Sequence, residues 1–315
     1  MAAASLLVAG AATLPACASA DDPPEIPPEN PPAAPLYGPA FSATWHDGNA
    51  ELAGYRLTYP RYGAQRSGTA VAITVTEPFS WAPRVKASGD DTFGVVKLNL
   101  AEDFPTGVYD YNLMTSAFVA TEPVGGLPAG APVKVTFTAQ EWCGHAFQQS
   151  TFFPGKIEHR GFSYFDGEAE EEATLRAGAG LLAEDALFLW ARGLAAPAVA
   201  PGQEVEAPLL RSAAVVRLGH APVAIDEAEL EREDEAVQMD TALGRIAVRE
   251  ASVEVDREGA PDVEYTFWVE EAAPHRVVRW TRSDGYEAEL VGVDRMPYWG
   301  MNGPGGEAAL KRIGM

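Results

Sequence analysis

Short runs of alternating apolar and polar residues recur along most of the chain, and this period of two limits its possible folds more than any other feature. Between residues 133 and 138, Val133, Val135 and Phe137 fall on one face and Lys134, Thr136 and Thr138 on the other. Such alternation is the pattern of a half-buried strand. Similar runs cover residues 51–59, 71–76, 95–100, 108–118, 246–255, 263–270, 276–282 and 287–293. Turn residues separate them, which predicts a mainly β fold built as an antiparallel meander.

One stretch changes from a period of two to the period of a helix. Across residues 181–194, a helical projection places Leu182, Leu189 and Trp190 within one apolar stripe. Glu184, Asp185 and Arg192 lie on the opposite side, and Pro197 and Pro201 end the pattern. We expect one amphipathic helix here. Its apolar stripe either fills the core or lines a pocket for an apolar ligand.

The chain divides into segments by composition. Residues 40–178 form an N-terminal meander, and residues 179–300 form the helix and a C-terminal meander, which together make one continuous sheet. Within the second part, residues 208–218 are predicted as a strand and the acid-rich residues 225–236 as a solvated loop or edge. Residues 301–315 are predicted to be a flexible tail.

The N-terminal residues indicate export. Residues 2–16 are apolar but too short to anchor in a bilayer, which fits the core of a signal peptide over residues 1–20. Leu14-Pro15-Ala16-Cys17 resembles a bacterial lipobox, so Cys17 would carry an acyl anchor in the lipid bilayer. Alternatively, Ala18-Ser19-Ala20 would direct cleavage before Asp21. The Pro-rich residues 21–39 then form a semi-rigid tether.

The charge of the chain excludes some partners. The formal net charge is −22, and no Lys or Arg precedes Arg56. Nucleic acids and anionic membrane surfaces both require clustered basic residues, so neither is an expected partner. Cys143 is the one cysteine besides Cys17, so no disulfide is expected between internal cysteines.

Ionisable residues gather around one predicted hairpin. A turn at Pro154-Gly155 places Ser150 near His159, Gln149 near Arg160 and His145 near Tyr164. The resulting polar cluster consists of Glu141, Cys143, His145, His159 and Arg160. On a regular strand Glu141, Cys143 and His145 share a face, but neighbours at this spacing lie ~7 Å apart. We therefore expect a structural hairpin with Cys143 buried, no metal or cofactor, and no assigned catalytic residue.

Several motifs resemble a family of uncharacterised exported bacterial β-sheet proteins and lipoproteins. They are ALFLWAR at 186–192, PGQ at 201–203, ALGRI at 242–246, YTFWV at 265–269 and PHRVVRW at 274–280, while EWCGH at 141–145 and SYFDGE at 163–168 fit a narrower group. Some of those members are labelled septum formation inhibitors, although this chain lacks the S-x-S-x-R-R signature of nucleotide pyrophosphatases. The resemblance implies a curved, half-barrel-like antiparallel sheet with the helix in its concave face. It implies no activity.

Two functions from different classes remain. The first is a non-enzymatic lipoprotein of the cell envelope, facing the periplasm or exterior, which binds an apolar ligand or an envelope protein on its curved sheet. The second is an envelope hydrolase or metal-dependent enzyme centred on Glu141, Cys143, His145 and His159. A purely structural scaffold is a third possibility. The first is preferred because the sequence provides no complete set of nucleophile, base and orienting group.

Overall fold

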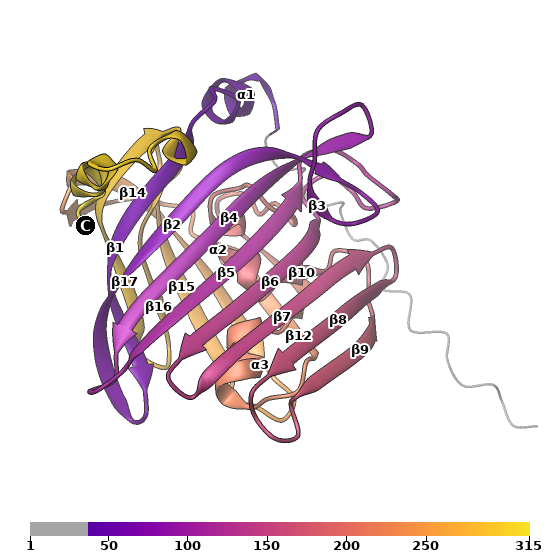
Figure 1. Ribbon diagram of the computed structural model, residues 1–315. Coiled ribbons are helices and arrows are strands. Elements are labelled where there is room, and N and C mark those ends of the chain that lie inside the picture. Colours follow the sequence, from indigo (N-terminus) through magenta and orange to yellow (C-terminus); the bar gives the residue numbers. More distant parts are fainter. Residues whose placement is uncertain (1–36) are drawn as a thin grey trace, which may run out of the picture. The chain divides into compact units, whose positions relative to one another are not determined.

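The alternating segments form the strands of one strongly curved sheet (Figure 1). The computed structural model describes residues 37–315, so the expected signal peptide, Cys17 and most of the tether lie outside the described residues. The strands of the N-terminal half are β1 (Ala50–Arg61), β2 (Ala64–Ser80), β3 (Val85–Lys86), β4 (Thr92–Pro105), β5 (Asp110–Ala120), β6 (Pro132–Glu141), β7 (Gly144–Phe153), β8 (Lys156–Ser163) and β9 (Glu170–Arg176). Those of the C-terminal half are β10 (Leu182–Ala183), β11 (Gln203–Leu210), β12 (Ile225–Arg232), β13 (Val237–Thr241), β14 (Gly244–Asp256), β15 (Val263–Glu270), β16 (Val277–Arg282) and β17 (Tyr286–Met296).

Neighbouring strands join mostly as antiparallel hairpins. The order across the sheet is β9-β8-β7-β6-β5-β4-β2-β1-β17-β16-β15-β14-β12-β11-β10, with the short strands β3 and β13 attached to β2 and β14. Pairing of β10 with β11 is parallel. The prediction of a mainly β chain with a large curved antiparallel sheet is confirmed.

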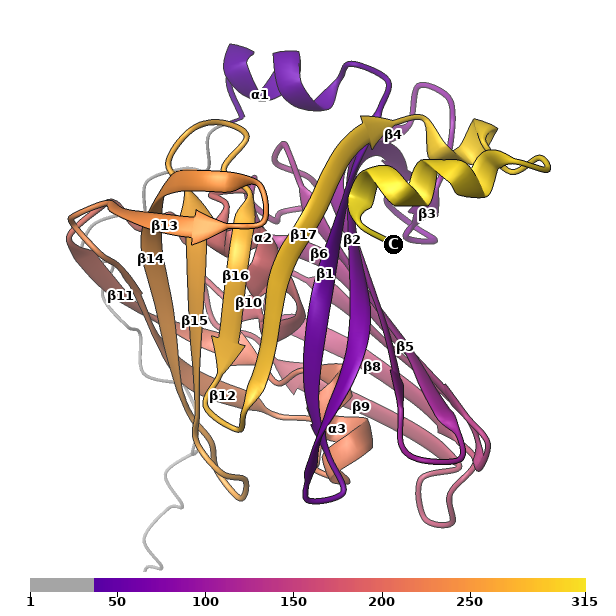
Figure 2. The same ribbon diagram turned by 90° about the vertical axis from the view of Figure 1, so that its left-hand side faces the viewer.

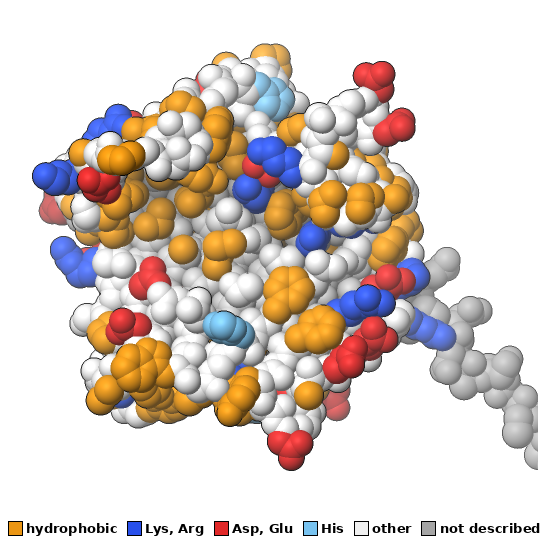
Figure 3. Space-filling model, viewed as in Figure 1, with side chains coloured by type: hydrophobic (Ala, Val, Ile, Leu, Met, Phe, Trp, Pro, Cys, Tyr) orange, Lys and Arg blue, Asp and Glu red, His pale blue; other side chains and the backbone are white. Residues whose placement is uncertain are grey.

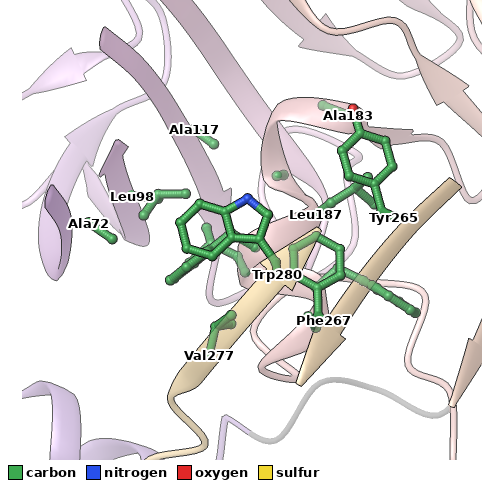
Figure 4. Packing of buried hydrophobic residues seen from close by; sticks show 14 of the residues in the cluster. Ala72, Leu98, Ala117, Ala183, Leu187, Tyr265, Phe267, Val277 and Trp280 are labelled. Atoms are coloured by element: carbon green, nitrogen blue, oxygen red, sulfur yellow. The ribbon is translucent and has the colours of Figure 1, made fainter. Parts of the chain in front are cut away.

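The two halves of the sheet curve around a shared core (Figure 2). Figure 4 shows Trp280 in this core, between Leu98 from β4 and the residues Leu187 and Phe267. Most of the longer strands contribute alternate apolar residues to the inner face, and their other residues form the outer face. The core therefore lies on the concave side of the sheet.

The segment that fills the concave side is less helical than its sequence predicts. A 3₁₀ turn, η1 (Glu184–Ala186), leads into a short helix, α2 (Leu187–Ala191), instead of one amphipathic helix over residues 181–194. All five residues of α2 are buried, so this helix has no polar face. Arg192 fixes its end by pairing with the buried Glu51 of β1 at 2.7 Å. Because the curved sheet surrounds α2, the side chains on every face of this helix are buried.

Two further helices and one strand replace other expectations. α1 (Pro39–Trp45) lies where strands were expected to begin, with its apolar residues one helical turn apart. Residues 208–218 are not one strand, because β11 ends at Leu210 and Ser212 caps α3 (Ala213–Gly219). The acid-rich residues 225–236 are not a solvated loop, since β12 lies inside the sheet. Its alternate residues Asp226, Ala228 and Leu230 are buried, which leaves the glutamates on the outer face.

The C-terminal residues pack on the sheet and are not the loose tail that their glycines suggest. A short turn, η2 (Tyr298–Gly300), precedes a 3₁₀ helix, η3 (Gly306–Ile313), on the outer face of β1 and β17. Ile313 is fully buried there. A Cβ at Gly54 would lie 2.1 Å from the Ile313 carbonyl oxygen, and one at Gly292 would lie 2.5 Å from its carbonyl carbon. The two glycines make this close contact possible.

The last residues of the predicted tether belong to the folded part. The Tyr37 hydroxyl donates a hydrogen bond to the Leu194 carbonyl at 2.7 Å, and its ring meets Phe41 edge to face. Across residues 37–315, no helix has the length and apolar character needed to cross a membrane.

Candidate functional site

The segment that carries the predicted polar cluster contains an additional turn, which its alternation does not suggest. Trp142 and Cys143 form a two-residue turn between β6 and β7, in which Glu141 pairs with Gly144. Glu141, Cys143 and His145 therefore do not share one strand face. Cys143 and His145 are exposed, which corrects the expectation of a buried cysteine, while Glu141 is buried.

The second turn is where the sequence places it, and its register is confirmed. Ser150 pairs with His159 and Gln149 with Arg160 across β7 and β8. His159 points into the core with its side chain 1% exposed, whereas Arg160 lies on the outer face beside Glu172. The five residues of the predicted cluster thus divide between the two faces of the sheet.

A different cluster of polar side chains, Ser150, His159 and Glu171, lies on the inner face of β7, β8 and β9. The Ser150 Oγ lies 2.9 Å from His159 Nδ1, and Glu171 Oε2 lies 3.9 Å from His159 Nε2. Burial lowers the pKa of His159 to about 4, so its imidazole is neutral at pH 7. The distance from Ser150 to His159 is that of a nucleophile and its base in an acyl-transfer site, whereas Glu171 lies beyond hydrogen-bond distance of the imidazole.

This arrangement lacks the other parts of such a site. Ser150 lies in the middle of β7, which is paired along both edges, so its backbone N–H groups are used in the sheet ladders. Backbone N–H groups are common donors of an oxyanion hole, and those beside Ser150 are not free for this role. Within residues 37–315, no three His, Cys, Asp or Glu side chains are placed to share a metal ion.

Helix α3 supplies a partner for Glu141 that the sequence does not reveal. The Arg217 Nη2 lies 3.6 Å from Glu141 Oε1, and its guanidinium stacks 4.1 Å from the Phe165 ring centre. Arg217 is buried on the inner face of the sheet. A strand was expected at this point, so alternation gave no signal for an inward arginine. The pair closes one end of the core.

The predicted apolar residues Leu182, Leu189 and Trp190 are all buried in the filled concave side. The Trp190 Nε1 donates a hydrogen bond to the Pro197 carbonyl at 2.9 Å, which fixes the ring in the core. A cavity of about 370 Å³ lies beside it, lined in part by Trp190, Val199, Arg232 and Val269. Trp190 therefore contributes to solid core on one side and to a pocket on the other.

Two neighbouring rows of side chains on the outer face contain no charged residue, and we call them the uncharged face. Cross-strand pairing aligns the first row, from β2 to β7, as Ile73, Asn99, Ser116, Thr136 and Gln149, beyond which the row meets the charged Arg160 of β8. The second row, from β2 to β8, consists of Val71, Ala101, Met114, Thr138, Phe147 and Phe162. Met114, Phe147 and Phe162 are 41%, 37% and 47% exposed. Figure 3 shows apolar side chains across the middle of this side, with most acidic and basic groups toward its margins.

The uncharged face ends in an apolar groove. Val71 and Ile73 form part of its floor, and Leu310 and Ile313 of η3 form a wall. The groove has a volume of about 370 Å³, and Glu307 is the one charged residue that lines it in the described chain. An apolar side chain or short apolar segment would fit this volume.

The outer face of the C-terminal half, in contrast, carries a row of acidic side chains. Glu206, Glu229, Glu254 and Glu264 stand directly opposite one another on β11, β12, β14 and β15. They line a groove of about 710 Å³. The charge of nearby glutamates, Glu204 first, raises the pKa of Glu229.

Comparison with known proteins gives no sequence match and a distant structural likeness. No family model matches the chain, and no curated protein matches its sequence. Among solved structures, it is similar to a beta-barrel-like protein of the domain of unknown function DUF1849 from Brucella abortus, at 11% identity and a TM-score of 0.46. The match covers 78% of this chain and 97% of that one. None of these comparisons supports the septum-formation label.

Proposed function

We propose that this chain is a non-enzymatic protein of the cell envelope that binds a protein partner on its sheet. The observation that carries the proposal is the uncharged face, which joins an apolar groove. Since the concave side is filled by residues 182–195 of the chain itself, the surface open to a partner is the outer one.

The composition of this face favours a protein over other partners. Centres of protein interfaces are depleted in Asp, Glu and Lys and enriched in aromatic residues and Met. In a chain with 45 acidic residues, both rows of the uncharged face lack any charge, and the second contains Met114, Phe147 and Phe162. The groove at Ile73 and Ile313 would accept one apolar anchor of the partner, the kind of contact that supplies most binding energy.

The envelope location rests on the N-terminal sequence. Residues 2–16 and the lipobox-like Leu14-Pro15-Ala16-Cys17 motivate export and acylation of Cys17. In that arrangement the Pro-rich tether holds the sheet away from the bilayer. Replacing Cys17 with Ala would move the protein from the membrane fraction to the soluble fraction. A native N-terminus at Asp21 would contradict acylation.

Photo-crosslinking in the native cells tests the partner. A benzophenone amino acid at Phe147 or at Leu310 is expected to give adducts of the same mass, and Met114→Lys is expected to weaken both. The same probe at Glu289, on the outer face of β17, serves as the control. Equal adducts from Glu289, or none from Phe147, would refute the uncharged face as the binding surface. An adduct of twice the chain mass would identify self-association and contradict a separate partner.

The hydrolase alternative has one observation in its favour, the 2.9 Å contact between Ser150 and His159. A fluorophosphonate reagent labels an activated serine, because the serine attacks phosphorus and displaces fluoride. We expect no labelling of Ser150, since both side chains are buried within the sheet. Stoichiometric labelling that Ser150→Ala abolishes would favour the hydrolase over the binding protein.

A further inference from the structure

A small chamber inside the curved sheet combines aromatic walls with carboxyl groups. Its volume is about 80 Å³, and its walls include the rings of Tyr59, Phe188, Tyr265, Phe267, Trp280 and Tyr286. Three carboxyl groups line it as well, Glu102 from β4 and the adjacent Glu184 and Asp185 from η1. These groups come from both halves of the sheet and from the segment between them.

The charges around the chamber do not balance. The Glu184 carboxylate is paired with Arg257 at 2.5 Å, and Arg282 forms a two-bonded pair with Asp284 at 2.9 and 2.7 Å. Glu102 and Asp185 have no such partner among the described residues. Glu102 accepts a hydrogen bond from the Tyr286 hydroxyl at 2.7 Å, and Asp185 accepts bonds from Ser212 Oγ and Ala213 N. Glu102 and Asp185 therefore face a cavity whose lining cation, Arg282, is already paired with Asp284.

The pKa values of the Glu102 and Asp185 carboxyl groups are both raised in this environment. Burial raises the pKa of Glu102 to about 7 and the pKa of Asp185 to about 7. Tyr286, Arg282 and Asp103 also act on Glu102, and Glu184 and Glu102 act on Asp185. A cation inside the chamber would favour the ionised form of both carboxyl groups.

The chamber adjoins a second cavity, which we call the entrance cavity. Tyr59, Ala214 and Arg282 line both the chamber and this second cavity of about 260 Å³, which lies between α3 and the ends of β1, β15 and β16. Ala214 and Arg282 are partly exposed. A small solute that approached along this second cavity would pass Arg61 and Arg257 as well as Asp262 and Asp284, which also line it.

We propose that the chamber binds a small primary ammonium group, such as methylammonium, ethylammonium or the amino end of a longer alkylamine. The aromatic faces attract the cation, and Glu102 and Asp185 accept its N–H donors. A cavity of about 80 Å³ equals the space of about two or three liquid water molecules, which suits a group of this size. A chain attached to the amine would extend into the entrance cavity. This site is separate from the uncharged face, so it does not depend on the proposed protein partner.

Calorimetric titration of the full chain with ethylammonium chloride tests the proposal. We expect saturable binding with release of protons near pH 6.5, measured by repeating the titration in buffers with different ionisation enthalpies. Ethanol, which has a similar size and no charge, is expected not to bind. Sodium chloride at the same ionic strength provides the background.

Isosteric variants locate the site. Glu102→Gln and Asp185→Asn are each expected to weaken ethylammonium binding by about tenfold or more, while Glu287→Gln on the outer face is expected to leave it unchanged. Each variant resembles the protonated acid and should fold, which circular dichroism would verify. Equal binding of ethanol, unchanged binding by Glu102→Gln, or no binding by the wild type would refute the proposal.

Discussion

Single residues differ in their importance according to the face of the sheet on which they lie. On the inner face, Glu102 and His159 are enclosed and have altered pKa values. On the outer face and in the turns, Cys143 and Arg160 contact solvent. Because successive residues of a strand point to opposite faces, a one-residue difference in the position of a turn reverses these roles.

Cys143 is expected to behave as a surface thiol. In a Cys17→Ala chain it is the one cysteine left, so Ellman's reagent should titrate one thiol in the native protein. Cys143→Ser should change the free energy of unfolding by less than about 0.5 kcal/mol, as for most surface substitutions. A thiol that reacts only after denaturation, or a loss of about 1–3 kcal/mol, would instead support the buried cysteine expected from alternation.

Glu102 is expected to make stability depend on pH. Its pKa is about 7 in the folded chain and 4.5 as the ordinary value, so the group is neutral in both states at low pH. As the pH rises from about 4.5 to about 7, the unfolded state ionises first, and the folded state loses up to about 3 kcal/mol of relative stability. Urea unfolding of wild type and Glu102→Gln across this range measures the effect. The wild-type curve should fall more steeply, and parallel curves would contradict the prediction.

At the scale of whole elements, short segments between the strands complete the fold. η1 and α2 fill the concave side, α3 closes one end of it, and η3 covers part of the outer face. None of them is a long amphipathic helix. Each one is stabilised by contacts with strands distant in sequence, as in the pairs Arg192–Glu51 and Arg217–Glu141.

The attachment of η3 is expected to contribute to stability. Ile313→Ala removes a fully buried side chain and should lower the free energy of unfolding by about 2–4 kcal/mol. Leu310→Ala, at a side chain 45% exposed, should change it by less than about 0.5 kcal/mol. Limited trypsin digestion provides a second measurement, since a released η3 would be cut after Lys311 and Arg312. Resistance of Ile313→Ala to trypsin, with unchanged stability, would mean that η3 is held by other contacts.

At the scale of the whole molecule, the two outer faces differ in charge. The N-terminal half carries the uncharged face, whereas the C-terminal half carries the row of Glu206, Glu229, Glu254 and Glu264. Like charges directly opposite one another on neighbouring strands destabilise a sheet. The net charge of −22 is therefore concentrated unevenly on the surface.

This row is expected to make stability depend on salt. The screening length falls from roughly 30 Å at 0.01 M salt to roughly 3 Å at 1 M, so added sodium chloride should raise the melting temperature. Glu229→Gln should raise it at low salt and have little effect at high salt. Asp91→Asn, in the exposed turn before β4, removes the same charge away from the row and should have a smaller effect. Equal shifts from both variants would mean that only net charge matters.

Much of the secondary structure follows from the sequence because the period of a strand is a local property of the backbone. The alternation at residues 133–138 and the turn at Pro154-Gly155 appear in the fold as expected. The predictions that were wrong also have local causes. A two-residue turn at Trp142-Cys143 has no strong turn signal, and the acidic residues of β12 conceal the alternation of their buried neighbours.

The sequence by itself determined a chain of amphipathic strands with an apolar segment near its middle and a large negative charge. Tertiary structure alone decided which side chains meet. Glu102, Asp185 and Tyr286 face one chamber although they are far apart in the chain, and Arg217 reaches Glu141 from a helix. The physical reason is that strand period depends on adjacent residues, whereas these encounters depend on the order and curvature of the whole sheet. That order is set by many weak cross-strand contacts together, and no single motif records it.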